Sequence, residues 1–384
     1  MMSGPPFDQL PVMATDAERM RQLFGRDDLV PLWVAEPYVD LAPAVVEAIQ
    51  SRASVPWYGY ETRPRVAVES FWEWTERRHG WTEGALSTSI SPSVGTSIGA
   101  LIDLVTDHGD GVILQPPVFT DFKPLVTAAG RTVVKNSLLH TDAGYRIDFD
   151  LLKAQAADPS VSLLILCNPH NPVGRAWTTA ELGAVASICA TSDVFVISDE
   201  IHADLVLGGA RFTPFGQAAA DTGVRWAATH GPIKTFGLAG ISDSLLISHD
   251  SDLTAAFRSM SSRLHLTRNN VFGVAAMSAA YHHGDAWLDQ FLGSISDNLA
   301  IVRMGLPDGI ELVEPDATFL AWLDFRSLGL QAPDLVRWLA DAGVAFSPGH
   351  WFGREGAGYA RMTVAAPTET VERAVELLRV AGAT

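Results

Sequence analysis

Short apolar runs rich in valine and isoleucine recur through the middle of the chain. They lie at residues 111–115, 131–135, 162–167, 194–198, 225–230 and 244–248. Runs of this length without polar alternation are typical of strands that are buried on both faces. Amphipathic stretches such as residues 178–190 separate several of the runs and predict helices. The alternation predicts an α/β fold with a mostly parallel sheet that is covered by helices.

The pattern changes in the last third of the chain. A long helical region is predicted at residues 270–300, and it is followed by a mixture of strands and helices that reads as a smaller α+β unit. The pieces of this unit are the apolar runs 319–325 and 359–365, a helix near 333–343 and a final helix. No linker rich in serine or glycine separates the two parts. We therefore expect a large domain over residues 50–289 and a small domain made of residues 1–49 and 290–384.

The composition excludes some classes of partner. The chain has 384 residues, of which 47% are hydrophobic and 18% charged, which is ordinary for a globular protein. Its formal net charge of −17 argues against binding to nucleic acid or to an anionic membrane surface. No apolar run approaches the roughly 18 residues that a membrane-spanning helix needs. We expect neither a nucleic acid partner nor membrane attachment.

The N-terminal stretch and the cysteines bear on the cellular compartment. The first residues, MMSGPPFDQLPVM, lack the basic segment followed by an apolar one that marks a secretory signal. Cys167 and Cys189 lie within a strand-like and a helix-like run, where we expect reduced core thiols rather than a disulfide. Both features indicate a cytoplasmic protein.

Polar residues cluster at the ends of four predicted strands. The segments QPPVF, CNPHNPVGR, DEIH and HGPIK close or follow the runs that end at residues 115, 167, 198 and 230. In open parallel sheets, ligands bind at the carboxyl ends of the strands. The four clusters therefore predict one binding site along that edge of the sheet.

Lys234 stands out because the chain contains so few lysines. Only four of its 27 lysine and arginine residues are lysines, and this one lies in the apolar segment HGPIKTFGLAG. A phosphate-binding Walker loop matches poorly, because Ile233 occupies the position of the glycine before the lysine. The chain has no G-x-G-x-x-G after a strand, no H-E-x-x-H and no C-x-x-C. Neither a nicotinamide dinucleotide site nor a zinc site is therefore supported.

A lysine in an apolar pocket at a strand end suits imine chemistry. Partial burial disfavours the ammonium form and lowers the pKa, so the neutral amine becomes available as a nucleophile. With pyridoxal phosphate (PLP) as the electron sink, a carboxylate is also needed to keep the pyridine nitrogen protonated. Asp199, directly after the apolar run 194–198, is the candidate for that carboxylate. Together with Asn171, these residues predict a PLP site.

Seven motifs follow one another in an order that resembles a known enzyme family. They are LWVA, YGY, QPPVF, CNPHNPVGR, SDEIHADL, KTF with LAG, and WLDFRSLGL, and they span nearly the whole chain. Together they resemble the fold type I PLP enzymes, and in particular the cystathionine β-lyase (MalY/PatB) branch of the aminotransferase superfamily. SDEIHADL and CNPHNPVGR are the motifs most specific to that branch.

The resemblance implies roles around the cofactor ring. Lys234 holds PLP as an imine, Asp199 pairs with the pyridine nitrogen, and Asn171 hydrogen-bonds the phenolic oxygen. His202 stands where related enzymes carry a tyrosine that binds the same oxygen. Phe119 matches the aromatic ring that stacks on the cofactor.

The resemblance also implies roles toward the phosphate and the substrate. Val94 and Gly95 match the turn at a helix N-terminus whose N–H groups hold the phosphate, as helix N-termini do for anions. Tyr60 matches a tyrosine that reaches the phosphate of the neighbouring subunit, which implies a homodimer with shared active sites. Arg361 matches the arginine that binds the α-carboxylate of an amino acid substrate as a bidentate fork.

The chain departs from the family pattern in two places. Around the phosphate, Ile233 replaces a serine or threonine, Gly231 also lacks a hydroxyl, and Ser242 stands where many aminotransferases carry an arginine. Near the N-terminus, LWVAEPYVD replaces the usual LWVADMDF. We expect Ala35 and Glu36 to bind the substrate, and Glu36 and Pro37 to line the substrate entrance. If the phosphate site is completed by other groups, His230 and Thr235 are the first candidates.

The predicted activity is carbon–sulfur β-lysis. Lys234, freed when the substrate amine replaces it on PLP, would remove the Cα proton, and the β-thiolate would leave, with pyruvate and ammonia as the other products. The choice of β-elimination is implied by the resemblance, and the substrate could be cystathionine or a bulkier cysteine S-conjugate. An aminotransferase is the first alternative. A PLP enzyme that decarboxylates or oxidatively deaminates such a conjugate is another, and a non-enzymatic regulator is disfavoured because no basic module precedes residue 30.

Overall fold

A seven-stranded sheet forms the centre of the larger part of the molecule. The computed structural model describes residues 4, 10–62, 65–142, 144–267, 270–330 and 332–383. In spatial order, the strands are β2 (Ser87–Ser91), β10 (Ser244–Ser248), β9 (Trp226–His230), β8 (Phe195–Asp199), β7 (Val161–Cys167), β3 (Gly111–Leu114) and β4 (Thr132–Lys135). β10 is antiparallel to both of its neighbours, and the other pairs are parallel. The predicted α/β fold with a mostly parallel sheet is therefore confirmed.

The apolar runs of the sequence account for six of these seven strands. Each predicted strand matches an observed one, with ends that differ by no more than one residue. The unpredicted strand is β2, whose sequence STSIS contains a single apolar side chain. β2 lies at one edge of the sheet and is only partly buried, so it does not need the apolar composition of the central strands.

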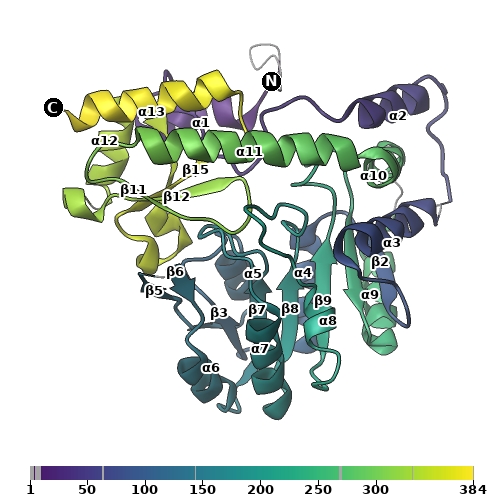
Figure 1. Cartoon of the computed structure of the whole chain (residues 1–384). Helices are drawn as coiled ribbons and strands as arrows, with labels where there is room; N and C mark the ends of the chain where they lie inside the picture. Colours follow the sequence, from purple (N-terminus) through teal and green to yellow (C-terminus); the bar gives the residue numbers. More distant parts are fainter. Residues whose placement is uncertain are drawn as a thin grey trace.

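Helices cover both faces of this sheet (Figure 1). Leu163 and Leu164 of β7 belong to two separate buried clusters, because successive side chains of a strand point to opposite faces. One face packs against α4 (Val94–Val105), α5 (Phe122–Ala128) and α9 (Ser251–Arg263), and the other against α6 (Phe149–Ala156), α7 (Thr179–Thr191) and α8 (Phe215–Ala218). α7 begins at a capping box, in which Thr178 and Glu181 each accept a hydrogen bond from the backbone N–H of the other.

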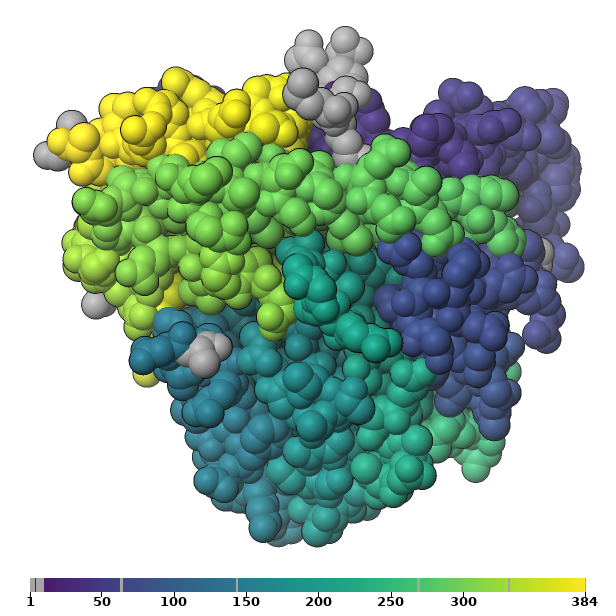
Figure 2. All heavy atoms as spheres, viewed as in Figure 1, coloured from purple at the N-terminus to yellow at the C-terminus, as the bar shows by residue number. Residues whose placement is uncertain are grey.

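A second, antiparallel sheet forms the smaller part. Its strands are, in order, β11 (Glu311–Val313), β12 (Leu320–Asp324), β15 (Tyr359–Thr363) and β14 (Ser347–Pro348). Its helices are α11 (Asp285–Gly305), α12 (Asp334–Ala342) and α13 (Thr368–Gly382). In Figure 1, α11 runs between α13 and the large sheet, and Figure 2 shows this green and yellow part resting on the teal body of the large sheet. The C-terminal third therefore contains both strands and helices, as predicted.

The remaining elements lie beside these two sheets. α2 (Pro43–Ala53) and α3 (Val66–His79) pack against α10 (Val271–His283), and α1 (Ala17–Phe24) packs against α12. A small hairpin joins β5 (Leu139–Thr141) to β6 (Gly144–Arg146), and single 3₁₀ turns lie at Met13–Thr15, Arg326–Leu328, Gly349–Phe352 and Arg354–Gly356.

The helical region predicted at residues 270–300 is two helices rather than one. α10 ends and α11 begins at Gly284, where a Cβ atom would lie 2.3 Å from the carbonyl oxygen of Ala280 and 2.3 Å from Cε1 of Phe236. Only glycine fits this approach, and the chain changes direction there. The predicted domain boundary near residue 290 lies within α11, and the division into two domains stays a prediction.

An N-terminal strap, defined here as residues 30–38, connects the two parts of the molecule. β1 (Val30–Pro31) pairs in parallel with β13 (Val344–Ala345) of the smaller part. Further backbone hydrogen bonds join Leu32 to Ala345 and Thr363, and Tyr38 to Ala365. The strap is therefore fixed to the smaller part by the same kind of bonds that hold a sheet together.

The cysteines and the apolar content of the helices bear on two further sequence-based expectations. Cys167 and Cys189 are both buried and free. None of the helices in the described part of the chain combines the length and the apolar composition that a bilayer crossing requires.

Candidate active site

The predicted site residues follow three neighbouring strands of the large sheet. Cys167 pairs with Asp199, and Asp199 pairs with Thr229, so the ends of β7, β8 and β9 lie side by side. Asn171 follows β7, Asp199 ends β8, and Lys234 follows β9. The parallel order places these three side chains at one edge, as expected for a ligand site of an open α/β sheet.

Lys234 lies in a tight turn after β9. This lysine turn, residues 231–237, is closed by backbone hydrogen bonds from Phe236 to Pro232 at 2.9 Å and from Leu238 to Ile233 at 3.1 Å. The side-chain amine donates to the carbonyl oxygen of Ala35, 2.6 Å away. Burial lowers the pKa of Lys234 to about 8, and nearby Arg361 acts in the same direction. The neutral amine is therefore accessible near neutral pH.

Asp199 is a buried carboxyl group that has no lysine or arginine within ion-pair distance in the described part of the chain. Its Oδ1 accepts hydrogen bonds from the backbone N–H of Ile201 at 3.2 Å and from the hydroxyl of Thr229 at 3.3 Å. Burial raises the pKa of Asp199 to about 6, against those hydrogen bonds and the positive charge of Lys234. A carboxylate this poorly compensated is suited to a cationic ligand.

Arg361 connects the smaller part to the strand ends. It lies in the middle of β15, and its Nη1 donates to Oδ1 of Asn171 at 3.1 Å. Its Nη2 donates to the carbonyl oxygen of Trp33 at 3.0 Å and to Oγ of Ser347 at 3.1 Å. The guanidinium carbon lies 4.8 Å from the centre of the Phe352 ring. Three segments of the smaller part thus hold Arg361 against the large sheet.

No carboxylate lies within ion-pair distance of Arg361 among the residues that the structure describes. The residue is 6% exposed, and burial lowers the pKa of its guanidinium to about 10. Its Nε has no hydrogen-bond partner among the described residues. A buried cation is normally paired, so this arrangement leaves room for an anion supplied by a ligand.

The strap supplies the wall between Lys234 and Arg361. The carbonyl groups of Ala35 and Trp33 accept from these two side chains, as given above. Glu36, the next residue, is half-buried, and burial raises the pKa of its carboxyl group while Lys234 lowers it. Ala35 and Glu36 therefore lie close to Lys234, and their role on the substrate side stays a prediction.

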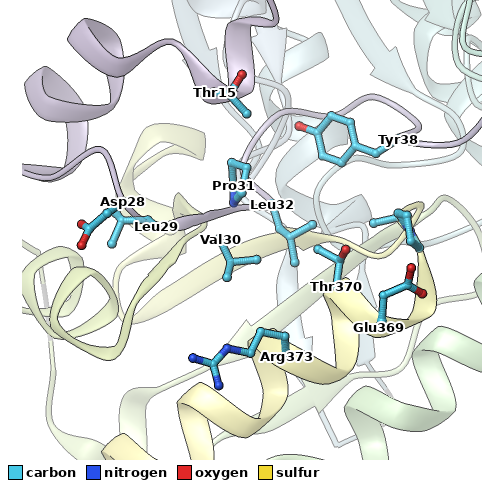
Figure 3. A pocket seen from close by; sticks show the side chains of 12 residues that line it. Thr15, Asp28, Leu29, Val30, Pro31, Leu32, Tyr38, Glu369, Thr370 and Arg373 are labelled. Atoms are coloured by element: carbon cyan, nitrogen blue, oxygen red, sulfur yellow. The ribbon is translucent and has the colours of Figure 1, made fainter. Parts of the chain in front are cut away.

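The opposite face of the strap lines a cavity of about 510 Å³ (Figure 3). Pro31, Leu32 and Tyr38 form one wall, and Glu369, Thr370 and Arg373 of α13 form the other. None of the predicted site residues lines this cavity. It is therefore separate from the polar cluster at the strand ends.

His202 and Phe119 flank the same edge of the sheet. His202 is buried, its Nδ1 has no partner among the described residues, and burial holds the pKa of its imidazole well below the usual range. It is also within electrostatic range of Lys234 and Arg361. Phe119 follows β3, is half-buried, and packs edge-on against Phe122 at 5.4 Å between ring centres.

Val94 and Gly95 begin a helix, with Val94 packed against the buried cluster on one face of the sheet, and Tyr60 lies at the surface. Val94 and Gly95 are the first two residues of α4, and Ser93 caps this helix by accepting from the N–H of Thr96 at 3.0 Å. The N–H groups of a first helical turn have no acceptor within the helix, so they can bind an anion. Tyr60 is 90% exposed, on the surface of the single chain.

The side chains of Ser242, His230 and Thr235, near the predicted phosphate site, have partners within the protein. Ser242 donates to the carbonyl oxygen of Asp243 at 2.9 Å. His230 lies 2.6 Å from Oε2 of Glu200, and Thr235 donates to Oδ2 of Asp204 at 2.9 Å. His230 and Thr235 stay predicted candidates for the phosphate site, with side chains that also bind these carboxylates.

Sequence reasoning missed the residues that support Arg361. Trp33 contributes a backbone carbonyl, and Ser347 accepts from Arg361 while it donates to Trp33 at 2.6 Å. Phe352 contributes only its ring. Trp33 acts through a carbonyl group, which every residue carries, and Ser347 and Phe352 lie far from it in the chain, so no sequence pattern connects them to Arg361.

The arrangement can hold an amino acid next to a nucleophilic amine. Arg361 suits its α-carboxylate, and Lys234 lies close enough for mutual electrostatic effects with Arg361, Glu36 and Asp199. Asp199 suits a protonated ring nitrogen. An amine with a lowered pKa, a carboxylate and an unpaired arginine in one site are suited to imine chemistry on amino acids.

Comparisons with known proteins agree with this geometry. Residues 27–378 match the family described as aminotransferase class I and II. Cystathionine beta-lyase PatB of Bacillus subtilis (strain 168) is 36% identical over 382 residues, covering 97% of this chain and 98% of that protein. Cystalysin from Treponema denticola, whose crystal structure contains a PLP cofactor, aligns with a TM-score of 0.91 and 27% identity over 99% of this chain and 98% of its own.

A third relative has the same overall structure. The PLP-bound C–S lyase from Staphylococcus hominis aligns with a TM-score of 0.89 and 26% identity over the whole of this chain, 100%, and 97% of its own. The fold type I architecture and the resemblance on which it was predicted are confirmed. The protein belongs to the aminotransferase class I and II family.

Proposed function

We propose that this protein is a PLP-dependent carbon–sulfur β-lyase that cleaves cystathionine or another cysteine S-conjugate to a thiol, pyruvate and ammonia. The observation that carries the proposal is the meeting of Lys234, Asp199 and Arg361 at one edge of the large sheet. Together these residues bind an amino acid and present a nucleophilic amine to it. The choice of C–S cleavage is supported by the names of the full-length relatives.

The residues of the site fit PLP. Asp199 is a buried carboxyl group, and no lysine or arginine lies within ion-pair distance of it in the described part of the chain. It can therefore accept a cationic partner from a ligand. Nδ1 of His202 is buried without a partner among the described residues. Arg361 donates to the amide oxygen of Asn171, so the NH₂ group of Asn171 can donate to the phenolic oxygen of the cofactor. Val94 and Gly95 offer N–H groups to the phosphate.

The residues divide the chemistry among them. PLP, when bound, supplies an electron sink that stabilises negative charge at the substrate Cα. Arg361 binds and orients the α-carboxylate, and Asp199 holds a proton on the ring nitrogen. Lys234 removes the proton from Cα as a general base, and the C–S bond breaks with its electron pair leaving on sulfur. The three-carbon fragment then takes up water and yields pyruvate and ammonia.

Phe119, Ala35 and Glu36 complete the walls in this proposal. Phe119 stacks on the ring of the cofactor and limits its movement. Ala35 offers its carbonyl oxygen to the amine of Lys234, and Glu36 faces the part of the substrate beyond sulfur. The identity of that part is set by these residues rather than by the chemistry at Cα.

An aminotransferase is the second candidate function. The matched family carries that name, and the same residues can return a proton to the cofactor rather than expel a thiolate. Decarboxylation or oxidative deamination of a cysteine S-conjugate uses the same three residues. These alternatives differ in the bond that breaks at Cα or Cβ and in whether a second substrate is needed.

One incubation separates the candidates. The purified protein is mixed with L-cystathionine or with an S-alkyl cysteine, with and without a 2-oxo acid. We expect free thiol and pyruvate in equal amounts without the 2-oxo acid. A product that forms only with the 2-oxo acid would instead establish the aminotransferase, and carbon dioxide release would establish a decarboxylase.

The lysine assignment has its own test. Borohydride reduction of the loaded protein, followed by peptide mapping, should place the reduced cofactor on Lys234. The other three lysines, Lys123, Lys135 and Lys153, serve as internal controls. A cofactor found on any of these would overturn the site.

We also propose a homodimer in which Tyr60 serves the site of the partner. Tyr60 is 90% exposed in the single chain, and Val55, Trp57 and Tyr58 beside it are exposed as well. Large apolar side chains grouped on one surface segment favour association. Mixing inactive Tyr60→Phe and Lys234→Ala proteins should restore part of the activity in hybrid dimers. An absence of recovery after verified subunit exchange would count against shared sites, given that Tyr60→Phe alone is inactive.

The proposed compartment is the cytoplasm. The support is chemical: Cys167 and Cys189 are free, and thiols persist in a reducing environment. Localisation of a tagged full-length chain by fractionation tests this directly.

A further inference from the structure

Asp204, a carboxylate outside the catalytic set, joins two segments that are far apart in the chain. Its Oδ2 accepts a hydrogen bond from the hydroxyl of Thr235 at 2.9 Å. Its Oδ1 accepts from Nε1 of Trp74 at 2.8 Å and lies 2.8 Å from Nε2 of His79. Trp74 and His79 belong to α3, whereas Thr235 directly follows Lys234. Asp204 therefore links the lysine turn to α3.

This junction is almost dry. Asp204 is 7% exposed, and Trp74 and Thr235 are each 1% exposed. Burial alone would raise the pKa of Asp204, but the hydrogen bonds from His79, Trp74 and Thr235 together lower it, so the group stays ionised. Charge-assisted hydrogen bonds in a dry site are short and strong, and a displaced partner would be left unsatisfied. The junction is therefore rigid.

Ring packing strengthens the same connection. The Trp74 ring lies edge-on to the ring of Phe236 in the lysine turn, with 5.6 Å between the centres. Arg77 of α3 donates to the carbonyl oxygen of Tyr281 at 2.8 Å, which fixes α3 to α10. The lysine turn is thus packed against α3 through Trp74, while the strap contacts the amine of Lys234.

We propose that Asp204 is a positioning residue for the catalytic amine: acting through Thr235, it holds the lysine turn in the conformation that keeps the amine of Lys234 against the carbonyl oxygen of Ala35. The proposal rests on the proposed function, because that function gives Lys234 its role. The side chain of Lys234 is long and flexible, and its hydrogen bond to Ala35 comes from a segment of the smaller part. Its placement therefore depends on the backbone of the turn.

The hydroxyl of Thr235 can be removed with little change in shape. Thr235→Val deletes the hydrogen bond to Asp204, and Thr235→Ser keeps it. Thr254→Val is the matched control, because Thr254 is 2% exposed and its hydroxyl donates to the carbonyl oxygens of Asp250 and Ser251 in α9. Both valine variants lose one buried hydroxyl, but only one of them touches the lysine turn.

The measurement is competitive labelling of the cofactor-free full-length chain with trace acetic anhydride across a pH series, read by peptide mass spectrometry. Lys123, Lys135 and Lys153 provide the internal references. Loss of the hydrogen bond between Thr235 and Asp204 should let more water reach the amine of Lys234 and raise the pKa of this amine. A rise of one unit from about 8 would slow labelling of Lys234 at pH 8 by about fivefold relative to the wild type.

The outcomes are distinct. The proposal predicts a shifted labelling profile in Thr235→Val, the wild-type profile in Thr235→Ser, and the wild-type profile in Thr254→Val even though its melting temperature falls. An unchanged profile in a folded Thr235→Val protein, with a loss of stability like that of Thr254→Val, would reduce Asp204 to a structural residue and overturn the proposal. Borohydride tagging of the wild type reports separately on whether Lys234 carries the cofactor.

Discussion

The side-chain amine of Lys234 donates to the backbone carbonyl of Ala35 across 2.6 Å, although 198 residues of chain separate the two. The acceptor is neutral, so it stabilises the ammonium form less than a carboxylate would. Burial therefore governs the amine and lowers the pKa of Lys234 to about 8. The strap and the lysine turn together set the reactivity of this residue.

The pH dependence of PLP capture follows from this contact. Only the neutral amine forms the imine, so the rate of capture by the cofactor-free protein should rise about tenfold per pH unit below pH 8 and level off above it. Stopped-flow absorbance during PLP addition measures the rate. Lys153→Ala should behave like the wild type and Lys234→Ala should show no covalent capture. A rate that kept rising to pH 10 would mean that the amine is not desolvated in solution.

Asp199 should make the cofactor-free protein less stable at neutral pH than at pH 4. Burial raises the pKa of this carboxyl group from 3.8 in the unfolded chain to about 6 in the folded protein. Between these values the folded state holds more protons than the unfolded state, so the free energy of unfolding falls as the pH rises from 4 to 6, by about 3 kcal/mol at most. Above pH 6 the loss is complete.

The Asp199→Asn variant tests whether the charge of Asp199 lowers the free energy of unfolding at neutral pH. Asparagine keeps an oxygen for Ile201 and Thr229 but carries no charge. We expect the cofactor-free variant to be more stable than the wild type at pH 8, with little difference at pH 4, as measured by denaturant unfolding. The loaded variant should lose about 10²–10³ in kcat, because the proton on the ring nitrogen is no longer held. A variant that is less stable than the wild type at pH 8 would show that the buried charge is compensated.

Arg361 should govern substrate affinity. Arg361→Ala removes charge-assisted hydrogen bonds worth about 1.5–3 kcal/mol, so KM for an amino acid substrate should rise about 10–150-fold. Ser347→Ala removes a single support of the guanidinium and should raise KM by a smaller factor. Steady-state kinetics of thiol release measure both effects, and Arg258→Ala, which loses contacts to Ser89 and Thr88 elsewhere, is the control. Equal effects in Arg361→Ala and Arg258→Ala would remove Arg361 from the substrate site.

The phosphate site should hold PLP weakly. Ile233 and Gly231 lack hydroxyl groups, and the hydroxyls of Ser242 and Thr235 are engaged with Asp243 and Asp204. We expect the cofactor to be lost on prolonged dialysis. Ile233→Ser should lower the Kd for PLP by up to about tenfold, since it adds one hydrogen bond to a charged group.

Gly231→Ser is the matched control for that experiment. A Cβ atom at residue 231 would lie 3.3 Å from the carbonyl oxygen of Asp243, which leaves little room for a side chain. The added hydroxyl should therefore not improve binding there. Fluorescence titration with PLP measures both variants, and unchanged or weaker binding in a folded Ile233→Ser protein would mean that other groups complete the phosphate site.

The sequence by itself determined the strands, their ends and the chemical groups at those ends. Six strands are apolar enough to be located within one residue, and five of them are buried strands of the sheet interior, where a strand covered on both faces needs apolar side chains. The order of the strands along the chain is enough to group Asp199, Asn171 and Lys234, since the carboxyl ends of parallel strands share one edge. The edge strand β2 escaped prediction because its partly buried positions tolerate serine and threonine.

The tertiary structure alone decided how the site is closed. The strap brings Ala35 to Lys234 and Trp33 to Arg361 through backbone carbonyl groups, which every residue carries and which no sequence pattern distinguishes. Burial likewise sets the pKa of Lys234 and of Asp199, because it depends on what the rest of the chain packs around them. Asp204 shows the same limit: its motif is visible in the sequence, but its hydrogen bond to Thr235 exists only because the segments that follow β8 and β9 meet in the folded chain.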